Sequence, residues 1–246
     1  MADWNDTDQR QGYTAVPRAG DAVARRETFD AGLRAHMLKI YNYMASGVML
    51  TGIVALLTAN SGLAAQFASG PMMWLVALSP LAIVFAMSFG ANRFSQGTLQ
   101  AMFWGFALLM GLSMSTIFLR FTGESIAATF FATAGAFAGL SLFGYTTKKN
   151  LQGFGTFLVM GLIGLLIAMV INIFLQSSAL MIAISFIGVL IFAGLTAYDT
   201  QRLKAEYQYL RGTEFAGKAV ILGALTLYLD FINMFQFLLQ FMGNRE

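Results

Sequence analysis

The sequence contains no cysteine and a single histidine among its 246 residues. Without cysteine, the chain has no disulfide framework, no thiolate nucleophile and no cysteine-based metal site. It also lacks a Ser/His/Asp set, a His-x-x-x-His pair and a glycine-rich phosphate loop. We therefore expect that the protein is not an enzyme and holds no cofactor.

Charged residues are scarce as well. Only 11% of the residues are charged and 57% are hydrophobic, whereas a soluble domain has roughly 25% charged and 45–50% apolar residues. This composition predicts an integral membrane protein whose surroundings are the lipid bilayer. The net charge of +3 is small, so we expect no nucleic-acid partner.

Seven apolar runs are long enough to cross a bilayer as helices. They span residues 37–59, 72–91, 98–119, 126–145, 151–175, 179–203 and 217–242. The sequence thus predicts an all-α integral membrane protein with a seven-transmembrane-helix bundle over 35–246. Residues 1–34 form a polar amino-terminal tail that lacks the apolar segment of a signal peptide. We expect a solvated arm, and its second half, 22–38, can alternatively form an interfacial helix.

The basic residues predict the orientation, because Lys and Arg concentrate in cytoplasmic loops. With seven spans, all but two of the fifteen Lys and Arg residues fall on the side of the amino terminus. The two exceptions are Arg120 and Arg245. We therefore expect a cytoplasmic amino terminus and a carboxyl terminus on the outer side.

An acidic residue, Asp230, lies in the middle of the last apolar run. Placing a carboxylate at that depth costs roughly 2.5–3.5 kcal/mol on insertion scales, so such a residue usually faces a bundle interior or a water-filled cavity. Asp199 lies near the end of the preceding run, and the polar connector between the runs is centred between Glu214 and Phe215. In an antiparallel hairpin the two aspartates would therefore lie at similar depth.

Both aspartates belong to stripes of residues spaced three and four apart, which share one face of a helix. The stripes are Ser185, Gly188, Phe192, Leu195 and Asp199 on one helix and Gly223, Thr226, Asp230, Asn233, Phe237 and Gln240 on the other. The sequence therefore predicts two carboxyl groups that face each other inside the protein.

Two buried carboxyl groups provide an oxygen site and a shared proton. At a separation of about 6 Å and an effective dielectric constant near 20, their repulsion is worth ~3 kcal/mol, so the pair is expected to share one proton near neutral pH. Oxygen ligands from Asp199 and Asp230, supported by Asn233, suit Ca²⁺ better than softer metals. We predict that these residues bind the ion and sense pH.

Two alternatives use the same aspartates. In one, Asp199 pairs with Arg202 on its own helix, Glu206 extends the charged face, and Asp230 bonds to a hydroxyl. In the other, the pair belongs to an intramembrane aspartyl protease, but the glycine-rich neighbourhood which that class needs is not supplied around Tyr198 or Asp230.

Three further features have two interpretations each. Arg93, at the end of the second span, can reach inward to a carboxylate or anchor to lipid phosphate. His36, at the junction of tail and membrane, is an interfacial residue or a pH sensor. Gly135-x-x-x-Gly139 has the spacing that allows close helix packing, and we expect packing there.

Four segments resemble the Bax inhibitor-one family, also called the transmembrane Bax inhibitor motif or YccA-like family. The segments are Lys39–Tyr41, the block Phe143-Gly-Tyr-Thr-Thr-Lys-Lys-Asn-Leu151 with Gly153 and Asn172–Phe174 following, Ala197-Tyr-Asp-Thr-Gln201, and Leu227-Tyr-Leu-Asp-Phe-Ile-Asn233. The resemblance covers about 35–243. The chain differs in having Asn150 where many members carry Asp.

The resemblance implies a seven-helix fold with the last helix central and a pH-sensitive calcium leak. Its acidic pair corresponds to Asp199 and Asp230, and the arginine that holds them in the closed form corresponds by position to Arg93. The family is linked to cytoprotection, and its bacterial members to membrane-protein quality control.

We therefore expect a pH-sensitive calcium leak channel of the bacterial inner (plasma) membrane, gated by protonation of the aspartate pair. The alternative is a regulatory membrane protein that binds a membrane protease or another partner and transports nothing.

Overall fold

The computed structural model describes residues 19–67 and 70–244, and these contain helices and no strand. The helices are α1 (Ala19–Asn60), α2 (Leu63–Phe67), α3 (Gly70–Gly90), α4 (Gln96–Met114), the 3-10 helix η1 (Ser115–Leu119), α5 (Gly123–Thr146), α6 (Gln152–Leu175), α7 (Ser178–Leu210) and α8 (Ala216–Met242). Within the described residues, seven helices are long and apolar enough to cross a membrane. The predicted all-α fold with seven spans is confirmed.

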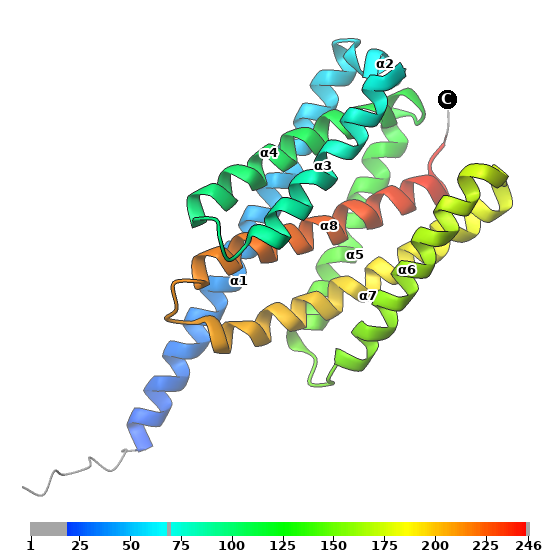
Figure 1. The fold of residues 1–246 in the computed structure, drawn as a ribbon. Coiled ribbons are helices and arrows are strands. Elements are labelled where there is room, and N and C mark those ends of the chain that lie inside the picture. Colours follow the sequence, from blue (N-terminus) through cyan, green and yellow to red (C-terminus); the bar gives the residue numbers. More distant parts are fainter. Residues whose placement is uncertain (1–18, 68–69, 245–246) are drawn as a thin grey trace, which may run out of the picture.

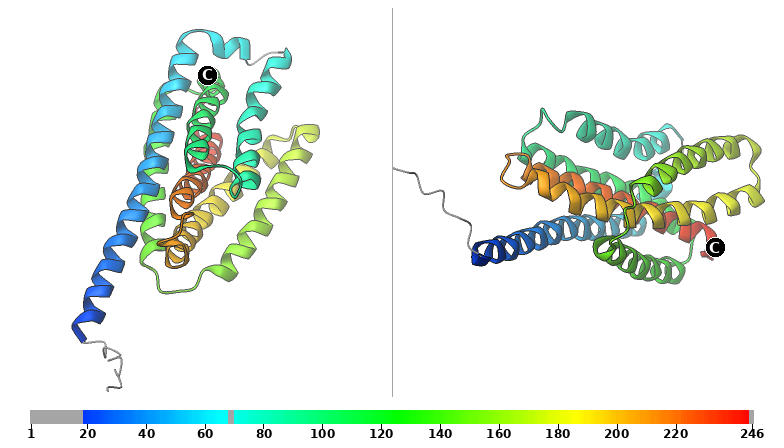
Figure 2. Two further views of the ribbon diagram at one scale, coloured as in Figure 1. Left: turned by 60° about the vertical axis from the view of Figure 1, so that its left-hand side comes forward. Right: turned by 90° about the horizontal axis from the view of Figure 1, so that it is seen from below.

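Helix α8 runs through the middle of the bundle (Figures 1 and 2) and packs against α1, α4, α5 and α7. Of its spanning window, 67% is buried inside the protein, against 11 to 39% for the other six. Helix α8 carries polar side chains, among them Asp230 and Asn233, on an otherwise apolar helix, and a central position keeps such side chains away from lipid. The prediction that the last helix is central is confirmed.

The helices define two ends of the bundle. The turn between α7 and α8, residues 211–215, lies at one end together with the connectors 91–95 and 147–151, and we call this the hairpin end. The last described residue, Asn244, lies at the opposite end, which we call the far end. There its carbonyl accepts a hydrogen bond from the amide of Thr122 (3.2 Å), and its amide donates to Ser125 Oγ (2.9 Å).

Helix α1 is longer than the sequence suggested. Its described part continues without a break from Ala19 through the expected boundary between tail and bundle at 34/35, so residues 22–38 are helical and lead directly into the first span, as the alternative interpretation allowed. Contacts with α7 explain the extension: Phe29 and His36 lie against the ring of Tyr207, with ring centroids 5.5 and 5.1 Å apart, and Leu33 is buried. Residues 1–18 of the expected tail lie outside the described residues.

The predicted packing at Gly135 and Gly139 is wrong, because a Cβ atom placed on either glycine would meet nothing within 4 Å. Other glycines bring α5 and α6 close to α7. A Cβ on Gly144 would overlap the backbone of Ala197, and one on Gly155 would overlap the ring of Tyr198. The close approach of helices therefore occurs at the hairpin end, around the segment that carries Asp199.

Candidate functional site

The structure brings Asp199 of α7 and Asp230 of α8 together. The two helices run antiparallel, and close contacts flank the pair on both sides: Gly223 lies against Leu203, and Gly188 lies against Phe237. A side chain larger than hydrogen at either glycine would push the helices apart. The packing of the hairpin thus fixes the register in which the two carboxyl groups meet.

The two carboxyl groups are buried and contact each other. Asp199 is 6% exposed and Asp230 is 4% exposed, and the two carboxyl groups are close enough to interact electrostatically. Two acidic groups buried this close together oppose each other's ionisation. Oδ2 of Asp230 is also buried and has no hydrogen-bond partner among the described residues, so the pair keeps an unused oxygen acceptor.

Arg202, one turn after Asp199 on α7, is the cation at this pair. Its Nη2 atom lies 2.9 Å from Oδ1 of Asp199, and its Nε atom lies 3.5 Å from Oε1 of Glu206. This is the intrahelical pairing that the sequence allowed as an alternative. The second half of that alternative, a hydroxyl partner for Asp230, is not found in the part of the chain that the structure describes.

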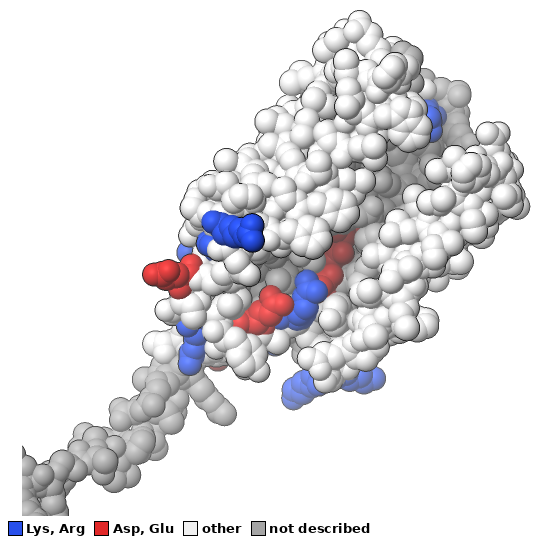
Figure 3. Space-filling view, viewed as in Figure 1, with Lys and Arg blue, Asp and Glu red and all other residues white. Residues whose placement is uncertain are grey.

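The structure does not bring Arg93 to the aspartates. Arg93 is exposed in the turn between α3 and α4 and forms no ion pair with any described residue. Figure 3 shows basic and acidic side chains gathered at the hairpin end, with some of them extending into a furrow between the helices. The gating role of Arg93 stays a prediction, and the cation that contacts the pair in this structure is Arg202.

A chain of hydroxyl groups next to the pair was not predicted. Thr200 Oγ1 lies 2.9 Å from Ser141 Oγ, which in turn lies 2.5 Å from the hydroxyl of Tyr41. The three residues tie α7 to α5 and α1 at the level of Asp199. Tyr41 and Thr200 lie in segments that carried the family resemblance, but no periodicity in the sequence indicates that they share a partner on α5.

The segment Ala197–Gln201 also fastens the connector between α5 and α6. The Gln201 side chain accepts a hydrogen bond from the amide of Leu151 (2.9 Å) and donates one to the carbonyl of Lys149 (2.8 Å). Asn150, where many relatives were expected to carry Asp, accepts from the amide of Gln152 (2.9 Å) at the start of α6. An Asp side chain can make the same contact, so this position has a structural role that both residues can fill.

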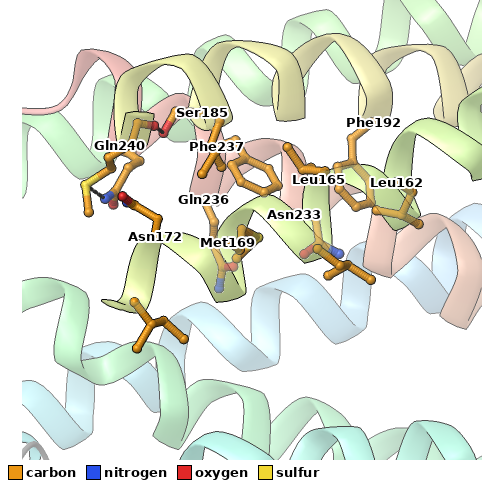
Figure 4. A pocket seen from close by; sticks show the side chains of 14 residues that line it. Leu162, Leu165, Met169, Asn172, Ser185, Phe192, Asn233, Gln236, Phe237 and Gln240 are labelled. Carbon is orange, nitrogen blue, oxygen red and sulfur yellow. Dashed lines mark hydrogen bonds between the residues drawn. The ribbon is translucent and has the colours of Figure 1, made fainter. Parts of the chain in front are cut away.

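A cavity of about 360 Å³ lies on the far-end side of the pair, between α6, α7 and α8 (Figure 4). Its polar lining consists of Asn172, Ser185, Asn233, Gln236 and Gln240. Asn233 follows Asp230 by one turn of α8, which is about 4.5 Å along the axis. Its Nδ2 atom donates to the carbonyl of Leu229 (2.8 Å). The predicted supporting residue therefore lines this cavity, one turn of α8 away from Asp230.

Comparison with known proteins identifies the family. The family model described as inhibitor of apoptosis-promoting Bax1 matches residues 33–246. The chain belongs to this Bax inhibitor-1 family. It is 49% identical to an uncharacterized protein of Caulobacter vibrioides over 88% of this chain and 92% of that protein. It is 45% identical to the inner membrane protein YbhL of Escherichia coli K12 over 94% of this chain and 98% of that protein. The recognition made from the sequence is confirmed.

This member of the Bax inhibitor-1 family offers few ligands for a resident metal ion. Among the described residues, no group of three or more His, Cys, Asp or Glu side chains could hold one. Ca²⁺ takes six to eight oxygen ligands, and one oxygen of the pair already contacts Arg202. The two carboxyl groups therefore supply only part of the ligand set of a Ca²⁺ ion.

Proposed function

We propose that the protein is a Ca²⁺ leak channel of a bacterial inner membrane, opened by protonation of the aspartate pair. The observation that carries the proposal is the position of Asp199 and Asp230. They lie buried between an amide-lined cavity on the far-end side and an ion-paired arginine on the hairpin-end side. Buried acidic residues in membrane helices commonly mark ion or proton pathways.

The route begins at the far end. Amide and hydroxyl oxygens of the cavity replace part of the hydration shell of the ion, as pore-lining oxygens do in channels. Asn233 carries the ion from the cavity to Asp230, whose Oδ2 atom has no hydrogen-bond partner among the described residues. Arg202 then blocks the way to the hairpin end, because a cation held at Asp199 repels Ca²⁺.

Protonation of the aspartate pair releases the block that Arg202 forms. The charged groups that face one another here are Asp199, Asp230, Arg202 and Glu206, and Lys148 and Lys149 of the connector between α5 and α6 line the same hollow as Arg202 and Glu206. Asp199 holds Arg202 while it is ionised, so the closed arrangement is strongest at higher pH. When pH falls and the pair takes up its second proton, the attraction between Asp199 and Arg202 is lost and the guanidinium moves away. The leak is therefore expected to rise as pH falls.

The membrane in which the protein lies and its orientation there are supported by separate arguments. A relative of nearly the same length is named an inner membrane protein, which supports the same membrane for this chain. The distribution of basic residues supports a cytoplasmic amino terminus and an external carboxyl terminus. The hairpin end is then the cytoplasmic end, and the arginine block faces the cytoplasm.

The test is Ca²⁺ uptake into proteoliposomes as a function of pH. The wild-type protein should show uptake that increases as pH is lowered, and Asp230→Asn should lose most of this dependence. Glu214→Gln removes an exposed acid from the α7–α8 turn and should leave the profile unchanged. Absence of pH-dependent uptake by the wild-type protein would reject the channel and favour the regulatory binding protein.

A further inference from the structure

A second cavity lies at the hairpin end, away from the aspartate pair. It has a volume of about 420 Å³ and is lined by residues of α1, α4, α7 and α8, among them His36, Lys39, Tyr43, Gln96, Tyr207 and Gly217. Among the described residues that line it, none is acidic. The cavity therefore combines a basic side chain with several hydrogen-bond donors and no competing carboxylate.

The amino terminus of α8 opens into this cavity. Its N-cap residue, Phe215, provides no side-chain cap, and the first turn contains no acidic residue. The amides of Gly217 and Lys218 have no hydrogen-bond acceptor among the described residues. The positive end of the helix dipole and its unpaired N–H groups favour an anion at such a position.

The histidine provides an independent sign of a ligand. His36 is 92% buried, since only 8% of it is exposed, yet its ring nitrogens form no hydrogen bond with any described residue. One face of the ring lies against Tyr207, and the ring forms part of the cavity wall. The residue is thus mostly buried while its ring reaches the cavity, so a ligand oxygen there could accept a hydrogen bond from the imidazole.

The hydrogen-bond donors that line this cavity indicate which kind of ligand fits it. Lys39 supplies a full positive charge, His36 and the Gln96 amide supply side-chain donors, and α8 supplies backbone donors. A phosphate group offers several oxygen acceptors and a negative charge, so it matches this set better than a carboxylate. We propose that the cavity binds a phosphate group, carried either by a small soluble molecule or by a lipid headgroup at the membrane surface.

The single histidine makes the site directly observable. In tag-free, full-length protein labelled with ring-¹⁵N histidine, the imidazole signals come from His36 alone. The protein is placed in micelles of a maltoside detergent, which carries no phosphate, and titrated with sodium phosphate at constant pH, and sodium chloride of equal ionic strength serves as the reference. We expect a saturable shift of the His36 signals with phosphate and none with chloride.

The lipid source is tested in a second arm, with nanodiscs that contain phosphatidylglycerol. Binding of the headgroup predicts shifted His36 signals before phosphate is added and little further change afterwards. Either pattern supports a phosphate site and identifies its source. Unchanged signals in both arms would overturn the proposal.

A pair of variants separates the site from general surface charge. Lys39→Gln removes the charge at the cavity and should weaken binding at least about tenfold, as expected for loss of a charge-assisted contact. Arg34→Gln removes the same charge from an exposed position of α1 that does not line this cavity, and it should leave the affinity unchanged. Equal weakening in the two variants, or none in Lys39→Gln, would also overturn the proposal.

Discussion

Replacing Arg202 with glutamine tests the block that the structure shows. The variant keeps a polar side chain of moderate length and removes the charge 2.9 Å from Asp199. Two charges about 4 Å apart interact by ~4 kcal/mol at an effective dielectric constant of 20. The Arg202 side chain is 41% exposed, so solvent screening reduces this to about 1–2 kcal/mol.

That free energy sets the expected change in the protonation of the pair. Because 1.36 kcal/mol corresponds to one pH unit, the pair should take up its second proton about one unit higher in pH, since the ionised form of Asp199 loses its stabilising cation. The variant also removes the blocking charge itself, so resting leak at neutral pH should rise and uptake should vary less with pH than in the wild-type protein.

The assay is Ca²⁺ uptake into proteoliposomes over a pH series. Arg34→Gln serves as the matched control, because it removes an exposed charge of α1 that does not line the hollow beside Arg202, and it should leave the midpoint of uptake unchanged. An unchanged resting leak and pH profile in Arg202→Gln would refute the assignment of Arg202 as the block.

Three further predictions follow from the fold and from the sequence. Gly144→Ala should lower stability by about 1–3 kcal/mol through overlap with the backbone of Ala197, whereas Gly139→Ala, with open space around it, should not; thermal unfolding in detergent measures both. Arg93→Ala should raise the resting leak if Arg93 helps to close the channel, as the family resemblance implies, and flux at neutral pH measures this. A reporter fused after Glu246 should be active only outside the cytoplasm.

Each of these three has a clear contrary result. Equal melting temperatures for the two glycine variants would show that α5 and α7 do not approach closely at Gly144. A resting leak unchanged in Arg93→Ala would leave that residue as a lipid anchor. A reporter found in the cytoplasm would reject the odd number of spans.

The register of the last hairpin was predictable because it depends on local features. Hydropathy located both helices, and the polar connector placed Asp199 and Asp230 at equal distances from the turn. Once the two helices pack as an antiparallel pair, this symmetry leaves the aspartates at one level. The contacts of Gly223 and Gly188 on either side agree with that register.

The identity of the cation was less predictable. Arg202 has the i,i+3 spacing to Asp199 and was considered as a partner, while position along the chain and family resemblance pointed to Arg93. Which arginine reaches the pair depends on where α3 lies relative to α7 and on the side-chain conformation of Arg202. Neither the position of α3 nor the side-chain conformation of Arg202 is encoded in a local sequence pattern.

The predictions for glycine packing and for the start of α1 differ from the structure for a related reason. The spanning helices are apolar on nearly all sides, so the sequence does not show which face of α5 meets a neighbour, and Gly144 could not be preferred over Gly139. The start of α1 packs through Phe29 and His36 against Tyr207, which is far away in the sequence. Both features depend on tertiary structure.

The most direct test of the central claim is the pH dependence of Ca²⁺ uptake in Asp199→Asn, Asp230→Asn and the double variant. Two carboxyl groups that share a proton titrate as one unit, so removing either should abolish most of the dependence between about pH 5 and 8. Effects of residues that act together are not additive, and the double variant should lose little more than either single variant. Additive losses, or a single variant with the wild-type profile, would contradict a shared gating site.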